Sequence, residues 1–582
     1  MSSHRPAAVP TAVQVIEAER RLRTRAHDGV TTDMAVAAAE RAGVCIRPLL
    51  RQVTDRATGA VSTVPIACGS TREKVCPSCA VKARRLRMHQ CREGWHLTED
   101  PPRHLDTDRL DDEEQPEEEE EDEDQEDEAS DEGAQPRRVR STRHLSGFPD
   151  LPTLPVQDRT IGTAFTDERT GRTYRPSMFL TLTLPSYGKV LPGTGVPRNP
   201  ARYDYRRAAL DALLFPRLVD RFWQNLRRAA GYKVQYFAAV EPQRRLAPHL
   251  HAAVRGAIPR ATIKAVARGT YAAIWWPSID EVVYDGDTLP VWDRDREAYA
   301  DPATGAALPT WQDALDRLDA DPVGEDVEPM HVLTFGAQVD IKGLLGGTPN
   351  SDRAVRYLCK YLTKSIADTY AQTAHTDRAD DELDPTAVAY ERHIDRLHRE
   401  VRWLPCSPAC ANWLRHGIQP KDPGPGLIPG ACPSKAHDRD HLGLGGRRVL
   451  VSRHWSGKTL TQHKADRVAV VRAVLTEAGI DAPEADRLAA DVLHQDGLPR
   501  FVWEDVPVCE RDYTAVITAS LRQAQRWRTQ YDDAKRAAAQ RDSPRGSPPD
   551  GPVDSHSANS PTAASMVGSY EEENDGTTVE PR

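Results

Sequence analysis

A run of acidic residues divides this chain into parts that must fold without it. Between Asp106 and Glu132 there are 19 acidic side chains and a single Arg, which gives this stretch a net charge of −18. Like charges at this density repel one another, and the stretch has almost no apolar side chains with which to bury a core. We therefore expect residues 106–136 to form a disordered linker with folded modules on both sides.

The remainder of the chain is basic. The full sequence of 582 residues has a net charge of −10, and the tail 541–582 is also acidic, so the rest carries a net charge of +13. A basic remainder fits a polyanionic partner such as nucleic acid. The acidic linker is then either a solvated spacer or a mimic of nucleic acid that competes for the basic surface.

Composition predicts seven segments along the chain. They are a helical N-terminal segment at 1–44, a Cys-rich zinc module at 45–105, the acidic linker at 106–136, a domain of strands and helices at 137–375 with an acidic insert near 280–328, a second Cys-containing, basic module at 401–460, a helical region at 461–540 and a disordered tail at 541–582.

The sequence has neither an apolar run of 18 residues nor the charged-then-apolar layout of a secretory signal. We therefore expect a cytoplasmic protein with no membrane partner. In that compartment its ten Cys are thiols or metal ligands rather than disulfides.

A hairpin at residues 236–254 gathers groups that bind divalent ions. His249 and His251 are two residues apart on its second strand, so both imidazoles leave the same face, while the residues between and after them face a core. Glu241 returns across from the His pair and completes a three-ligand site with open positions. Gln243 is a weaker candidate, and a merely polar strand face is the alternative interpretation.

A second motif combines phenols with ammonium groups. In the segment 356–364, four side chains fall at i, i+3, i+4 and i+7 and predict one stripe along a helix: Tyr357, Lys360, Tyr361 and Lys364. Each Lys can neutralise a phosphate oxygen and favour the phenolate form of its neighbour. The stripe suits phosphate chemistry, although an ordinary surface helix would show the same pattern.

Two groups of Cys have spacings that suit tetrahedral zinc. The first is Cys68, Cys76, Cys79 and Cys91, with Cys45, His89 and His96 as spare ligands. The second is Cys406, Cys410, Cys432 and His437, with His441 and His416 as alternates. For the first group, a set of unrelated reduced thiols is the alternative.

Basic residues beside the Cys groups are candidates for DNA contact. Near the first group these are Arg84, Arg85 and Arg87. After the second group they are Arg447, Arg448, Arg453 and Lys458, with Trp455 as a possible stacking platform for a base. A basic surface turn is the alternative there. Further upstream, a strand at 331–340 places Gln338 and Asp340 on one face, toward the site or toward solvent.

The order of the motifs resembles a known superfamily. The strand Met178–Leu184, then the His-x-His strand and then the Tyr-x-x-Lys-Tyr helix are similar to the HUH endonucleases, and more narrowly to rolling-circle replication initiators of actinobacterial plasmids and integrative elements. The doubled Tyr is also similar to the A proteins of isometric single-stranded DNA phages. The resemblance covers roughly residues 45–100 and 170–465.

This resemblance implies an α+β fold with a ferredoxin-like antiparallel sheet, the His pair on a central strand and the Tyr helix packed nearby. It implies Mg²⁺ or Mn²⁺ on His249, His251 and Glu241, although two imidazoles would also accept Zn²⁺ or Co²⁺. A Tyr oxygen attacks the scissile phosphate, and a 5′-phosphotyrosine link and a free 3′-OH result. Either Tyr could start the reaction; Tyr361, which follows Lys360, is favoured. Lys360 and Lys364 are expected to contact phosphate.

We therefore predict a plasmid-type replication initiator that nicks and rejoins one strand of its origin. Its partners would be double- and single-stranded origin DNA together with a host helicase and DNA polymerase, because the sequence has no GxxxxGK[ST] helicase motif. The alternatives are an HUH relaxase or transposase that acts at a transfer origin or element end, and a non-enzymatic zinc-containing DNA-binding regulator.

Overall fold

A five-stranded antiparallel sheet forms the centre of the protein in the computed structural model. The structure describes residues 31–95, 97, 145–157, 159, 165–166, 168–169, 171, 173–174, 176–320, 328–345, 348–360, 362, 385–445, 448–477, 493–494, 496–506 and 513–541. The strands of this sheet, in spatial order, are β12 (Val339–Leu345), β5 (Pro176–Thr183), β7 (Pro248–Arg255), β6 (Tyr236–Pro242) and β13 (Val449–Val451). β7, which carries the His pair, is therefore the central strand.

One face of the sheet packs on helices and is apolar. Leu180, Leu182 and Leu250 alternate with polar residues along β5 and β7 and are fully buried on this face. The main covering helices are α4 (Tyr205–Ala230) and α5 (Arg260–Gly269), and α9 (Pro385–Trp403) packs against α4. α4 begins where the Asp204 side chain accepts a hydrogen bond from the Arg207 amide, and it ends at Gly231, which has a φ of 70°.

The opposite face, which carries the His pair, is partly covered by two helices. They are α3 (Pro77–Trp95) from the Cys-rich segment and α7 (Pro349–Leu358) from the segment with the Tyr motif. The fully buried Trp455 packs between α3 and Phe237 of β6. A Cβ at Gly94 would collide with the Trp455 ring, so the close approach of α3 requires glycine there.

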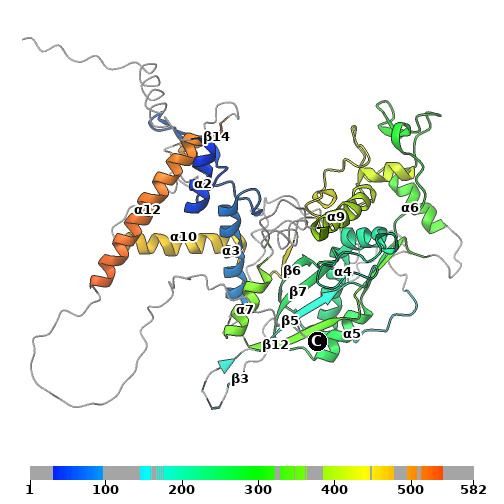
Figure 1. Cartoon of the computed structure of the whole chain (residues 1–582), viewed down its shortest axis with the longest axis horizontal. Helices are drawn as coiled ribbons and strands as arrows, with labels where there is room; N and C mark the ends of the chain where they lie inside the picture. The colour runs from blue at the N-terminus through cyan, green and yellow to red at the C-terminus, as the bar shows by residue number, and fades with distance from the viewer. Residues whose placement is uncertain are drawn as a thin grey trace, which may run out of the picture.

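Segments from the two ends of the chain form one unit. The strands β1 (Leu49–Asp55) and β2 (Val61–Ile66) form a three-stranded sheet with β14 (Phe501–Asp505), and α2 (Thr32–Ala42) packs on α12 (Tyr513–Arg541). Two hydrogen bonds from the Arg500 guanidinium to the Asp55 carboxylate join the two segments. Figure 1 shows α3 standing between this unit and the central sheet, with α10 (Leu460–Glu477) crossing next to it. The predicted helical region at 461–540 thus contains a strand that pairs with the Cys-rich segment.

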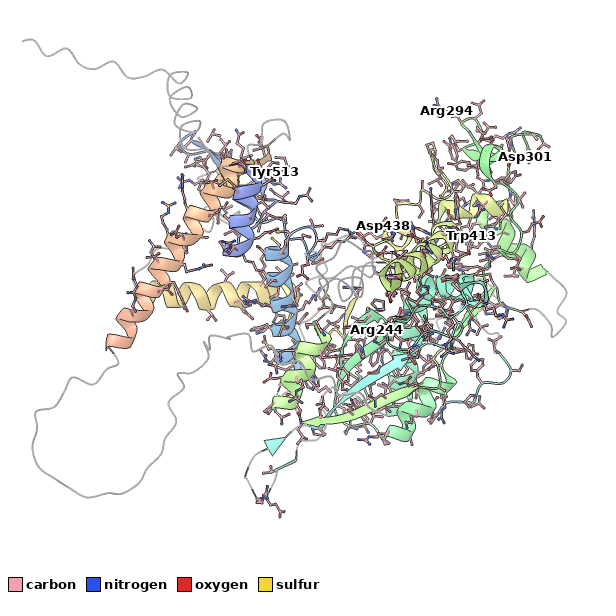
Figure 2. All side chains as sticks on the ribbon, viewed as in Figure 1. Arg244, Arg294, Asp301, Trp413, Asp438 and Tyr513 are labelled. Atoms are coloured by element: carbon pink, nitrogen blue, oxygen red, sulfur yellow. The ribbon has the colours of Figure 1, made fainter. Side chains whose placement is uncertain are left out.

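The acidic insert is folded where it is described. It contributes β9 (Val291–Asp293), β10 (Ala298–Ala300) and α6 (Trp311–Ala320), and Arg294 and Asp301 lie at its outer end, away from β5 and β7 (Figure 2). The strand predicted at 331–340 is two strands, because β11 (His331–Thr334) pairs with β8 (Tyr271–Ile274) and β12 then joins the central sheet. The remaining short elements are β3 (Phe165–Thr166), β4 (Thr173–Tyr174), η2 (Pro200–Arg202), η3 (Gly286–Thr288), η5 (Ala411–His416) and η6 (Lys435–His437).

The architecture is a mixture of helices and antiparallel sheets with clustered Cys, as predicted for the α+β class. The acidic linker at 106–136 and the tail from 542 lie outside the described residues. Among the helices that are described, none combines the length and the apolar character needed to cross a bilayer.

Candidate functional site

Two imidazoles and a carboxylate meet at the end of the central hairpin. Glu241 on β6 lies directly opposite His249 on β7, and His251 follows two residues later on the same face. The Nε2 atoms of the two His are 2.6 Å apart, and His251 Nε2 lies 3.9 Å from Glu241 Oε2. Three possible ligand atoms therefore lie within 4.8 Å of one another.

All three side chains are buried, and burial controls their protonation. It raises the pKa of Glu241 to about 8 and lowers the pKa of His249 to about 3 and that of His251 to about 4. Glu241 Oε1 and His249 Nδ1 are buried with no hydrogen-bond partner among the described residues. The atoms that converge are the two Nε2 atoms and Glu241 Oε2, and a divalent cation bound among them would suit this donor set.

Thr181 on the neighbouring strand orients one of the imidazoles. It lies opposite His251 in the β5–β7 register, and its Oγ1 is 2.9 Å from His251 Nδ1. When Nδ1 donates to this hydroxyl, the lone pair of Nε2 faces Glu241 and His249. A partner of this kind fixes the tautomer of a ligating His. The alternation in the β5 sequence places Thr181 and Thr183 on the same face as the His pair. A hydroxyl partner for an imidazole could therefore have been predicted from the sequence.

Asp340 and Gln338 reach the edge of the same face. Asp340 on β12 lies opposite Thr181 and raises the pKa of His251, against the larger effect of burial. Its side chain is half-exposed and lies 3.6 Å from the Lys342 ammonium. Gln338 contributes its main-chain carbonyl, which accepts a hydrogen bond from Thr183. Gln243 points elsewhere, since its amide oxygen accepts from Arg245.

Tyr357 brings a phenol to the His pair. It is on the last turn of α7, a helix that begins at a capping box between Thr348 and Ser351. Its Oη lies 3.3 Å from His251 Nε2, and its ring packs edge-on against His251 and Phe179. The side chain is 44% exposed, so an incoming substrate can reach the oxygen.

The helix that carries Tyr357 ends before Lys360. α7 ends at Leu358, Cys359 has a φ of −98° and a ψ of 2°, and the Lys360 amide donates back to the Tyr357 carbonyl. Lys360 therefore lies in a turn and not one helical turn along from Tyr357. Tyr361 and Lys364 lie outside the described residues. Cys359 is fully buried, as expected of a small core residue.

Cationic groups surround the carboxylate of the site. Lys360 and Arg448 both act to lower the pKa of Glu241, although burial outweighs them. Burial also lowers the pKa of Arg448 to about 10, although the nearby Glu241 carboxylate raises it. On α3, Arg84 and Arg87 are close enough to the Cys359 thiol to oppose the rise of its pKa with burial. Positive charge thus borders the His face from two elements.

The first sulfur cluster consists of Cys45, Cys68, Cys76 and Cys79. The Sγ atoms of Cys45 and Cys76 are 3.9 Å apart, close to the roughly 3.8 Å between two sulfurs on one tetrahedral zinc ion. Cys91, which spacing grouped with this set, lies three turns further along α3, about 18 Å from Cys79 by helical rise. It packs instead beside Cys359, and Cys45 takes its place in the cluster. His96 lies outside the described residues.

The second sulfur cluster brings together Cys406, Cys410, Cys432 and His437. Cys406 and Cys432 have Sγ atoms 4.0 Å apart, and Cys410 Sγ lies 3.5 Å from His437 Nε2. His437 Nδ1 donates to the Val401 carbonyl at 2.7 Å, which leaves Nε2 as the ligand atom. The alternates lie apart from it: His441 contacts Arg72, and His416 contacts the Glu281 carbonyl.

The basic segment after this cluster is arranged differently from the prediction. Trp455 is 0% exposed and its indole N–H donates to the Cys91 carbonyl, so it cannot stack on a base. Apolar burial against α3 stabilises it there. Lys458 is engaged by Glu93 and Asp466, whereas Arg453 is exposed. Arg447 lies outside the described residues.

Comparison with known proteins assigns the chain to a family. The family described as replication initiator protein, pSAM2 (RepSA) matches residues 31–542, which is most of the chain. Neither the curated proteins nor the solved structures contain a match. The match extends through both sulfur clusters, the hairpin and the Tyr segment, and it confirms the resemblance to plasmid initiators. The chain is thus a member of the RepSA family of plasmid rolling-circle replication initiators.

Proposed function

We propose that this replication initiator nicks and rejoins one strand of its origin DNA through a phosphotyrosine intermediate. The observation that carries the proposal is the Tyr357 oxygen at 3.3 Å from a buried imidazole that shares its face with a second imidazole and a carboxylate. The central position of β7, with helices packed on the apolar face of the sheet, supports the ferredoxin-like HUH arrangement that the motifs imply.

Each residue of the site has its own role in the proposed reaction. Glu241, His249 and His251 would hold Mg²⁺ or Mn²⁺, which when bound polarises a phosphate oxygen. Tyr357 supplies the nucleophile: its oxygen forms a bond to phosphorus, the bond from phosphorus to the 3′-oxygen breaks, and that oxygen takes up a proton while the phenol proton is lost to water. Thr181 holds His251 in the ligating tautomer. Reversal of the same step rejoins the strand.

The cations beside the site bind the DNA backbone. Lys360, Arg448 and the Arg side chains of α3 are near enough to the site to affect its ionisable groups, and we expect them to contact phosphates on either side of the scissile bond. The protein would bind both double-stranded and single-stranded origin DNA. A host helicase would unwind the nicked duplex, and a host DNA polymerase would extend the free 3′-OH. The two sulfur clusters would each hold a structural Zn²⁺. Tyr361, which the sequence motif favoured as the first nucleophile, is proposed as the second one, with Lys364 assisting it.

Incubation of the purified chain with end-labelled single-stranded origin DNA and Mn²⁺ tests the proposal. We expect a covalent adduct on a denaturing gel, with the modified peptide mapping to 357–361. Replacement of both His249 and His251 by Ala should abolish the adduct and leave duplex binding largely intact. Adduct formation by the double His variant at the wild-type rate would refute the site.

A further inference from the structure

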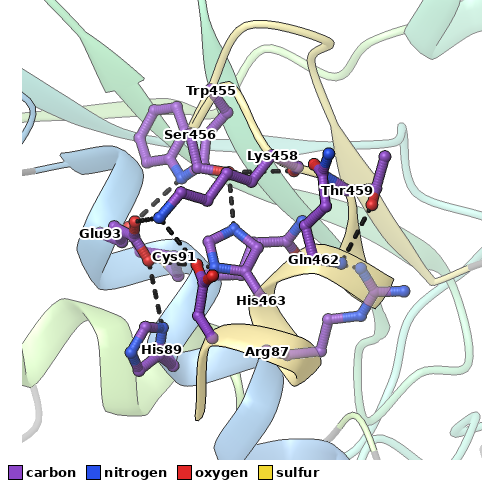
Figure 3. A network of polar contacts seen from close by, with 12 residues as sticks. Arg87, His89, Cys91, Glu93, Trp455, Ser456, Lys458, Thr459, Gln462 and His463 are labelled. Atoms are coloured by element: carbon purple, nitrogen blue, oxygen red, sulfur yellow. Dashed lines mark hydrogen bonds and ion pairs between the residues drawn. The ribbon is translucent and has the colours of Figure 1, made fainter. Parts of the chain in front are cut away.

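A second cluster of imidazole and carboxylate groups lies away from the catalytic hairpin, between α3 and α10. His89 and Glu93 are one turn apart on α3, so both side chains leave the same face of the helix. His463, near the start of α10, meets them from the other side (Figure 3). The ligand atoms of the three side chains lie within 4.8 Å of one another.

His463 is held so that one ring nitrogen points into this cluster. The side chain is 0% exposed, and its Nε2 lies 2.8 Å from the Ser456 hydroxyl. Ser456 donates its own proton to the Lys458 carbonyl, so its oxygen accepts from His463 Nε2–H. Nδ1 then carries the lone pair. It is buried, it faces Glu93 Oε2 at 3.0 Å, and no described residue donates a hydrogen bond to it.

Two acceptors at this separation repel unless a cation lies between them. His89 adds a further acceptor, with Nδ1 at 3.4 Å from Glu93 Oε2 and without a hydrogen-bond partner in the described part of the chain. When an ion binds its ligands at about 2.1 Å, neighbouring ligand atoms lie about 3.0 to 3.4 Å apart. The distances from Glu93 Oε2 to His463 Nδ1 and to His89 Nδ1 both fall in this range.

The other oxygen of Glu93 is already occupied. Lys458 lies 2.7 Å from Glu93 Oε1 and 2.8 Å from Asp466 Oδ2 (Figure 3). This ammonium fixes the carboxylate so that Oε2 faces the two rings, in the way that outer partners orient metal ligands. An open groove beside the cluster leaves room for water as a further ligand.

We propose that His89, Glu93 and His463 form a fourth metal site of this chain, one that takes a Zn²⁺-type ion and ties α10 to α3. Two imidazoles and one carboxylate suit zinc better than Mg²⁺, which prefers oxygen ligands. The ion joins a helix of the Cys-rich segment to the helix that follows Trp455, and α3 in turn packs on α7, which carries Tyr357.

Zinc content at equilibrium tests this site in the full chain. His89→Ala and Glu93→Gln should each bind about one equivalent of Zn²⁺ fewer than wild type after dialysis against micromolar Zn²⁺. Arg92→Ala is the matched control, since Arg92 lies on the same groove but contributes no ligand, and it should retain the full content. His89 is half-exposed, and its removal leaves the Lys458–Glu93 pair in place, so this variant should fold.

Hydrogen exchange supplies a second readout. Zn²⁺ should slow amide exchange in residues 460–470 of wild type and of Arg92→Ala, but not of His89→Ala, whereas Mg²⁺ at the same concentration should have no effect. Equal zinc content in all four proteins, or zinc-dependent protection of α10 that survives His89→Ala, would overturn the assignment.

Discussion

The phenol oxygen of Tyr357 lies 3.3 Å from Nε2 of His251, although 106 residues separate them in the chain. The contact joins α7 to the central strand of the sheet. Among the described residues, no other Tyr places its phenol oxygen against the group of Glu241, His249 and His251. It places a phenol on the face where we propose that a phosphate is polarised.

Tyr357→Phe should therefore lower adduct formation on single-stranded origin DNA by about three orders of magnitude or more, because the ring stays packed on Phe179 while the attacking oxygen is lost. Rates of adduct formation in Mn²⁺ provide the measurement. Tyr531→Phe, on the distant α12, is the control and should react normally. A Tyr357→Phe protein that forms adduct at the wild-type rate would assign the first attack to Tyr361.

Thr181→Val should weaken activation by Mn²⁺ by about 10- to 100-fold, because His251 loses the partner that holds its tautomer. At saturating Mn²⁺ the nicking rate should recover most of its wild-type value, which separates positioning from chemistry. Thr183→Val is the matched control, since the Thr183 hydroxyl donates to the Gln338 carbonyl and not to a His. An unchanged Mn²⁺ requirement in Thr181→Val would exclude the positioning role.

Local patterns predicted the elements that hold the candidate site. Alternation in the hairpin fixed the face of His249 and His251, and the return of the chain placed Glu241 across from them, as the register shows. These features depend on neighbours within about 20 residues, so periodicity is sufficient to find them.

Long-range packing could not be found in this way. The pairing of β14 with β1, the replacement of Cys91 by Cys45 and the burial of Trp455 all depend on segments that meet only in the folded chain. The sequence pattern also did not predict that α7 ends at Leu358. A Tyr-x-x-Lys-Tyr spacing is the same whether the helix continues through it or ends within it.

Cys45→Ser should lower the zinc content of the chain, and Cys91→Ser should leave it unchanged. Cys45 belongs to the first sulfur cluster, so its replacement should lose about one equivalent of zinc and destabilise the Cys-rich segment. Cys91 is buried beside Cys359 and should be dispensable for zinc. Metal analysis of the two purified variants decides between the sets, and zinc loss in Cys91→Ser alone would restore the spacing-based grouping.

His393 should make part of the stability pH-dependent. Burial lowers its pKa to about 4 from an ordinary value near 6.5, and its neighbours are the Tyr205 hydroxyl and Arg396. Between these pH values the unfolded chain binds more protons, so the stabilisation is present above pH 6.5 and is lost as the pH falls to 4. The loss amounts to about 3 kcal/mol. Urea unfolding of His393→Gln should show a smaller decline over this window than wild type, and an equal decline would contradict the assignment.

Trp455 and Arg453 are two residues apart, and their replacement should affect different properties. Trp455 is fully buried against Trp95 and Phe237, so Trp455→Ala should cost about 3 to 5 kcal/mol of unfolding free energy. Arg453 is exposed, so Arg453→Ala should leave stability unchanged and weaken binding to duplex origin DNA, with a salt dependence reduced by about one ion. Chemical unfolding and binding titrations at two salt concentrations measure both effects. If Trp455→Ala kept its stability and lost DNA affinity instead, the indole would have to leave its buried position to bind DNA.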